Sequence, residues 1–179
     1  MGEIKSTLDL VMEKTRGLTM TAEEKKRLKE EQAAQRAKGL FLKYREGFLP
    51  LGELRREVEQ DPDADEIKKQ VSMLMIESLE PTMAETAPLN DMKTWLGPKS
   101  SEALDKASRA LEEFRSKTAA LYAETEDRIR SELEKAGISG SAVKPKVNGN
   151  GQWRRLQHEL VSETGRTLET IKERLKSSL

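Results

Sequence analysis

Apolar residues recur at alternating intervals of three and four along 101–136 and again along 153–175, with charged residues between them. This spacing places the apolar side chains on one face of an α-helix, whereas a half-buried strand needs an interval of two. The two series are Leu104, Ala107, Leu111, Phe114, Leu121, Tyr122, Ile129 and Leu133, then Trp153, Leu156, Leu160, Val161, Thr164, Leu168, Ile171 and Leu175. The sequence therefore predicts two long amphipathic helices.

The segment between these helices, 137–151, is rich in glycine and serine, which predicts a loop. Ser100 or Ser101 is expected to cap the first helix, and Gly137 to end it. Two helices joined in this way form an antiparallel, coiled-coil-like hairpin. We expect both apolar series to form its core, and the loop to be mobile and the first place that a protease cuts.

Shorter helices are predicted before the hairpin. Residues 3–15 carry an apolar stripe, and we expect that helix to pack along the hairpin. Thr21 and Glu24 have the spacing of a capping box, which predicts that the next helix starts near Ala22. Leu51, Leu54 and Val58 predict a short helix that ends before Asp61, and a further helix is predicted over 66–80, before Pro81.

The helix that starts near Ala22 has two different parts. Residues 22–38 form a charged arm with Leu28 as its only large apolar residue, and 40–49 are expected to dock because they are rich in apolar and aromatic side chains. The arm either lies on the bundle through Leu28 and its alanines or is presented to a partner, and the sequence leaves both alternatives open.

The predicted domain organisation has two parts. The first, 1–98, is an N-terminal helical segment that contains the arm and a connector at 81–98, within which one helical turn is expected. The second, 99–179, is the helical hairpin. We expect the two parts to co-fold as one unit with an all-α fold, an elongated antiparallel helical bundle.

Composition supports this fold class. Aromatic residues make up 4% of the chain, and the 11 glycines and 6 prolines are too few for a β-sandwich or barrel with its many turns. Charged residues reach 36% against 35% hydrophobic, yet the net charge is zero, which disfavours disorder driven by charge repulsion. No cysteine, bilayer-spanning apolar run or charged-then-apolar leader is present, so we expect a cytoplasmic protein and no membrane association.

No motif predicts catalysis, a cofactor or a metal. The acidic run from Asp61 to Asp65 begins like a calcium-binding loop, but Glu66 and Ser72 occupy the positions that need glycine and a bidentate acid. Capping of the following helix by these acids is the preferred interpretation. The single histidine, His158, has no partner fixed by spacing, so the chain is not expected to be an enzyme.

Two basic segments are the candidate binding regions. Residues 22–46 hold eight bases and five acids, and 137–158 hold four bases and no acid. Trp153 could stack on a nucleic-acid base, but its register with the leucines favours an anchor between helices. The candidate partner-binding residues are Lys25, Lys26, Arg27, Lys29, Lys144, Lys146, Arg154 and Arg155.

These observations favour a non-catalytic helical interaction protein, a scaffold or adaptor that binds a protein partner or itself. The alternative is a nucleic-acid- or ribosome-associated factor that uses the basic segments 22–46 and 137–158. Against this alternative, proteins that bind phosphate backbones usually carry a clear excess of bases.

Overall fold

The computed structural model describes residues 21–82, 87–140 and 143–179, and these ranges contain helices and no strand. The predicted all-α fold is confirmed. The expected helix over 3–15 lies outside the described residues. By internal contacts the chain divides into two compact units, 1–71 and 72–179. The predicted co-folding of 1–98 with 99–179 stays a prediction.

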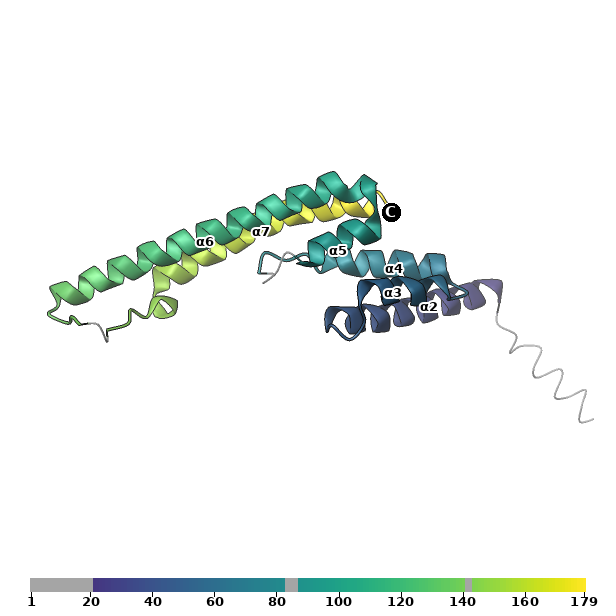
Figure 1. Cartoon of the computed structure of the whole chain (residues 1–179), viewed down its shortest axis with the longest axis horizontal. Coiled ribbons are helices and arrows are strands. Elements are labelled where there is room, and N and C mark those ends of the chain that lie inside the picture. Colours follow the sequence, from purple (N-terminus) through teal and green to yellow (C-terminus); the bar gives the residue numbers. More distant parts are fainter. Residues whose placement is uncertain (1–20, 83–86, 141–142) are drawn as a thin grey trace, which may run out of the picture. The chain divides into compact units, whose positions relative to one another are not determined.

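Six α-helices and two short 3₁₀ turns make up the described ranges (Figure 1). Their bounds are α2 (Ala22–Arg45), α3 (Leu51–Glu59), α4 (Ala64–Glu77), α5 (Ala87–Leu96), η1 (Pro98–Ser100), α6 (Ser101–Lys135), η2 (Val147–Gly149) and α7 (Gly151–Lys176). The boundary between the two units falls inside α4.

The start of α2 confirms the predicted capping box. The Thr21 hydroxyl accepts the Glu24 backbone N–H at 3.1 Å, and the Glu24 carboxylate accepts the Thr21 N–H at 2.7 Å. At the other end, Gly47 has φ +78°, and Phe48 N–H reaches back to the Lys43 carbonyl at 2.9 Å. This pattern satisfies carbonyls that the end of a helix leaves without partners.

The buried part of α2 is longer than predicted. Besides Leu40 and Phe41, the alanines Ala33 and Ala37 are buried, because small side chains let neighbouring backbone approach closely. Residues 21–32 are all exposed, Leu28 among them. The second half of the arm therefore packs through its alanines, one of the two alternatives that the sequence left open, whereas Leu28 takes no part in this packing.

The first unit closes its core with α3 and the start of α4. Leu54 and Val58 of α3 and Ile67 and Val71 of α4 are buried. The loop between these two helices is tied to α2, since the nearly buried Asp61 carboxylate lies 2.7 Å from the Arg36 guanidinium. The other Asp61 oxygen accepts the Asp63 N–H at 2.9 Å, and Asp65 and Glu66 occupy the first turn of α4, which agrees with acidic capping.

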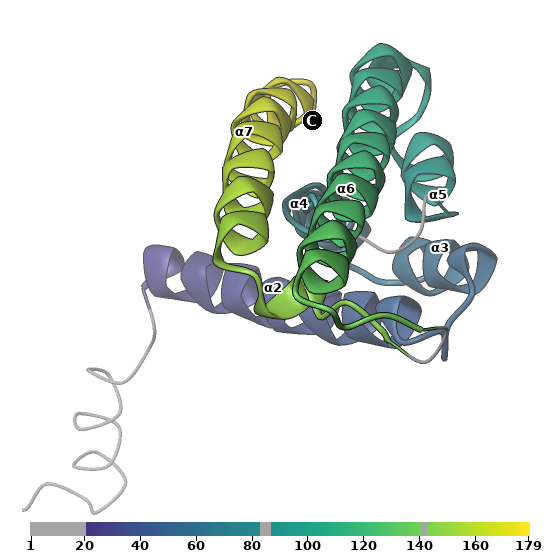
Figure 2. The ribbon, with the colours of Figure 1, turned by 90° about the vertical axis from the view of Figure 1, so that its left-hand side faces the viewer.

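The second unit is built on the antiparallel hairpin of α6 and α7, which confirms the predicted pairing. The two helices lie side by side along most of their length (Figures 1 and 2). The 35 residues of α6 span about 52 Å at the rise of an α-helix. Gly137 ends α6 in the left-handed conformation with φ +77°, as predicted.

The helix caps of the hairpin differ from the prediction at one end. Ser100 makes no side-chain capping bond, because it closes the preceding 3₁₀ turn and is itself buried. Helix α7 is capped by Asn150, whose side-chain oxygen accepts the N–H groups of Gln152 and Trp153 at 2.9 and 3.1 Å.

Helix α5 packs on the base of the hairpin, against the beginning of α6. It has ten residues rather than the single turn that we expected, and Leu89, Met92 and Trp95 are buried. The Trp95 indole N–H donates to the buried Ser72 hydroxyl at 2.9 Å, which joins α5 to α4. Lys93 pairs with Asp105 of α6 at 2.6 Å.

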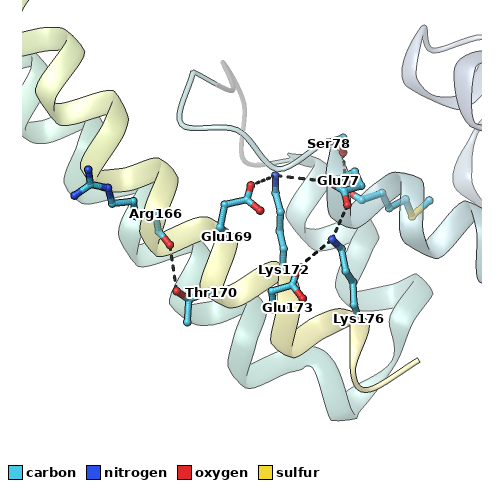
Figure 3. Close-up of polar contacts among 9 residues, drawn as sticks. Glu77, Ser78, Arg166, Glu169, Thr170, Lys172, Glu173 and Lys176 are labelled. Carbon is cyan, nitrogen blue, oxygen red and sulfur yellow. Dashed lines mark hydrogen bonds and ion pairs between the residues drawn. The ribbon is translucent and has the colours of Figure 1, made fainter.

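A charged cluster fastens the last turn of α4 to the end of α7 (Figure 3). The Glu77 carboxylate lies 2.6 Å from the Lys176 ammonium and 4.0 Å from that of Lys172. Lys172 is 7% exposed and also pairs with Glu169 at 2.7 Å. The hydrogen bond from Lys176 lowers the pKa of the Glu77 carboxyl, and the same bond raises the pKa of Lys176.

Candidate interaction surface

Burial is unequal along the hairpin. At its base, Leu104, Leu111 and Leu168 are fully or almost fully buried, because α5 and the end of α4 add a further layer there. Along the middle, Leu156 and Leu160 are only half-buried. Two helices cover each other on one side only, so the middle of the hairpin leaves apolar surface open to solvent.

The exposed middle forms a groove between α6 and α7. Its larger hollow has a volume of about 390 Å³, and an adjoining hollow of about 70 Å³ shares Lys117, Leu160 and Glu163 with it. The residues that line the larger hollow are Lys117, Ala120, Leu121, Glu124, Leu156, Glu159, Leu160 and Glu163. The hairpin groove, as we call the two hollows together, is lined by the three leucines Leu121, Leu156 and Leu160 and by charged side chains.

The charges around the hairpin groove are mainly acidic. Four glutamates line it, at 113, 124, 159 and 163, against the single base Lys117. Lys117 pairs with Glu113 at 2.8 Å; the hydrogen bond between them lowers the pKa of Glu113 and raises that of Lys117. Arg155 pairs with Glu159 at 3.2 Å. Among the described residues, neither Glu124 nor Glu163 has a base within ion-pair distance, although the charge of Glu163 also contributes to the raised pKa of Lys117.

A second cluster lies where α7 begins, against α6 next to the hairpin groove. Trp153 is buried, and its ring meets that of Tyr122 edge to face, with the centroids 5.3 Å apart. Val147, from the connecting segment, is also buried. Trp153 is therefore an anchor between the helices, as its register indicated, and is not available to stack on a nucleic-acid base.

The four candidate basic residues of 137–158 are all exposed. Lys144 and Lys146 lie in the segment that leads into α7, and Arg154 and Arg155 lie in the first two turns of α7, the segment and helix that follow α6 in Figure 1. Within the part of the chain that the structure describes, Lys144, Lys146 and Arg154 have no ion pair.

The other four candidate residues lie on the exposed first half of α2, in the other unit. Lys26 pairs with Glu30 at 3.9 Å, and Arg27 with Glu31 at 3.3 Å, one helical turn further on. These ion pairs neutralise two of the four candidate bases on α2, Lys26 and Arg27.

Within residues 21–82, 87–140 and 143–179, no group of three or more His, Asp or Glu side chains is placed to hold a metal ion, and no helix has the length and apolar character needed to cross a bilayer. Comparison with protein-family models, curated proteins and solved structures returns no match.

The sequence did not indicate the hairpin groove. Leu156 and Leu160 were expected in the core because they continue the same apolar series as Leu168. The intervals between apolar residues are the same at the base of the hairpin, where α5 and the end of α4 cover it, and in its middle, where they do not. The burial of the leucines differs between base and middle only because α5 and α4 reach no further along the hairpin.

Proposed function

We propose that this chain is a non-catalytic helical interaction protein, a scaffold or adaptor, and that the hairpin groove is its binding surface. The observation that supports this function is the row of half-buried leucines, Leu121, Leu156 and Leu160, in an open groove. Covering apolar surface releases about 25 cal/mol for each Å², so a partner that fills this groove gains binding energy. A cytoplasmic location agrees with the lack of cysteine.

Two measurements test this function. One is crosslinking in a cell lysate followed by mass spectrometry, and the other is light scattering of the purified chain. We expect crosslinks from Lys117, the lysine inside the groove, to a protein partner or to a second copy. Leu160→Asp should remove these crosslinks, and Leu28→Asp, at an exposed position on α2, should retain them. A strict monomer that forms no crosslink from Lys117 would contradict the proposal.

A second candidate function is supported by the exposed bases before and at the start of α7. Lys144, Lys146 and Arg154 are exposed bases, and the acid-free segment 137–158 suits an anionic partner such as RNA. Changing these three residues to glutamine should weaken RNA binding, and affinity for RNA should fall between 50 and 200 mM salt. RNA affinity that is unchanged over this range of salt would exclude binding of RNA through the charges of these bases.

A further inference from the structure

The hairpin groove is long enough for a helix. Its lining runs from Ala110 to Glu124 on α6, which is about 21 Å and four helical turns. On α7 the lining runs from Leu156 to Thr167. A third helix laid between two packed helices buries its own apolar stripe against both of them, as in small helical bundles.

The charges that line the hairpin groove favour some partner helices over others. Four glutamates and one lysine line the hairpin groove, and Glu124 and Glu163 lie there without an ion pair among the described residues. We propose that the groove binds an amphipathic helix of a partner protein that carries leucine-type residues on one face and lysine or arginine on both sides of that face. This inference rests on the proposed function and names its partner.

A second copy of the hairpin fits less well. Its own groove face has the same acidic excess, so two copies placed face to face would bring like charges together. The segment 3–15, which the sequence predicts to pack along the hairpin, is the competing occupant within the chain. Over 3–16 it has three acids and three bases, so it offers the acidic groove no excess of positive charge.

Two designed 18-residue helical peptides with the same leucine stripe test the proposal on the full chain. One has lysines beside the stripe, the other has glutamates, and fluorescence anisotropy measures the affinity of each. We expect the lysine peptide to bind about tenfold more tightly, since several exposed ion pairs with the glutamates of the groove contribute together. Raising the salt from 50 to 300 mM should reduce this preference.

Matched variants separate the groove from general charge attraction. Glu124→Lys combined with Glu163→Lys should abolish or invert the preference for the lysine peptide. Glu112→Lys combined with Glu132→Lys makes the same change in net charge at exposed sites of α6 outside the groove lining, and should leave the preference intact. Circular dichroism checks that both double variants are folded. If the two double variants change the preference for the lysine peptide equally, the proposal is overturned.

Other results would overturn it in distinguishable ways. If both peptides bind equally and Leu160→Ala weakens both, the groove docks helices without regard to charge, and only the proposed partner chemistry is wrong. If neither peptide binds until Leu8→Asp is introduced, the segment 3–15 is the occupant. If neither binds but crosslinks from Lys117 to a protein partner are found, the inference fails and the proposed function stands. If the crosslinks are absent as well, both fail.

Discussion

Leucines with the same place in the sequence pattern contribute unequally to stability. Leu111 and Leu160 both belong to an apolar series of the hairpin, yet Leu111 is fully buried and Leu160 lines the open groove. Deleting a buried side chain costs its transfer free energy and leaves a cavity, whereas a groove residue is already in part exposed to water.

Leu111→Ala should therefore lower the free energy of unfolding by about 3 kcal/mol, and Leu160→Ala by about 1 kcal/mol. Urea unfolding followed by circular dichroism measures both values. Equal losses in the two variants would mean that Leu160 is covered in solution.

The ion pair between Glu77 and Lys176 predicts a dependence of stability on pH. The pKa of Glu77 is lowered from its ordinary value of 4.5, so the pair stabilises the fold above that pH, and this contribution is lost as the pH falls through the lowered pKa. The pKa of Lys176 is raised from 10.5, so the contribution is also lost as the pH rises through the raised value.

Glu77→Gln should accordingly lower the melting temperature at pH 7, and the difference from the unchanged chain should disappear in strong acid. Glu80→Gln, at an exposed position that makes no ion pair with any residue the structure describes, is the control and should have little effect at either pH. If the difference in melting temperature between Glu77→Gln and the unchanged chain stays constant as the pH falls into the acid range, the ion pair is not the cause of that difference.

At the level of the helices, a glycine inside α2 and a glycine just after its end have opposite backbone requirements. Gly39 lies inside the helix, and a Cβ there would meet no atom within 4 Å. Gly47 has φ +78°, a conformation that costs other residues about 1 kcal/mol.

Gly39→Ala should stabilise the chain by about 0.8 kcal/mol, because alanine is the better helix former, and Gly47→Ala should destabilise it by about 1 kcal/mol. Thermal unfolding of the two variants gives the comparison. Changes of the same sign would contradict this account of α2.

The first part of the arm, 22–32, is exposed, and whether it binds a partner is the alternative that the burial of Ala33 and Ala37 does not decide. Reversing Lys25, Lys26, Arg27 and Lys29 to glutamate should leave the melting temperature nearly unchanged and abolish partner binding, if the arm is a docking surface. A second variant that also changes Glu30 and Glu31 to lysine restores the ion pairs in the reverse direction and controls for their loss. Reduced stability with intact binding would show that the arm is only structural.

At the scale of the whole molecule, the exposure of the described residues predicts where among them a protease first cuts. Residues 137–140 are exposed, and Gly137 and Gly140 have positive φ, whereas Val147 further along the same connection is buried. Limited digestion with elastase should make its first cut between 137 and 146. A first cut in 22–38, identified by mass spectrometry, would contradict the prediction.

The all-α class, the antiparallel pairing of α6 with α7 and the ends at Thr21 and Gly137 follow from the sequence, because helical spacing, capping and glycine stops act over a few residues. The tertiary structure alone decides that Ala33 is buried and Leu160 is not. Burial depends on which neighbouring helix reaches a given turn, and the intervals between apolar residues carry no information on where α5 and α4 end along the hairpin. For that reason the hairpin groove, the surface on which the proposed function rests, was found only in the folded chain.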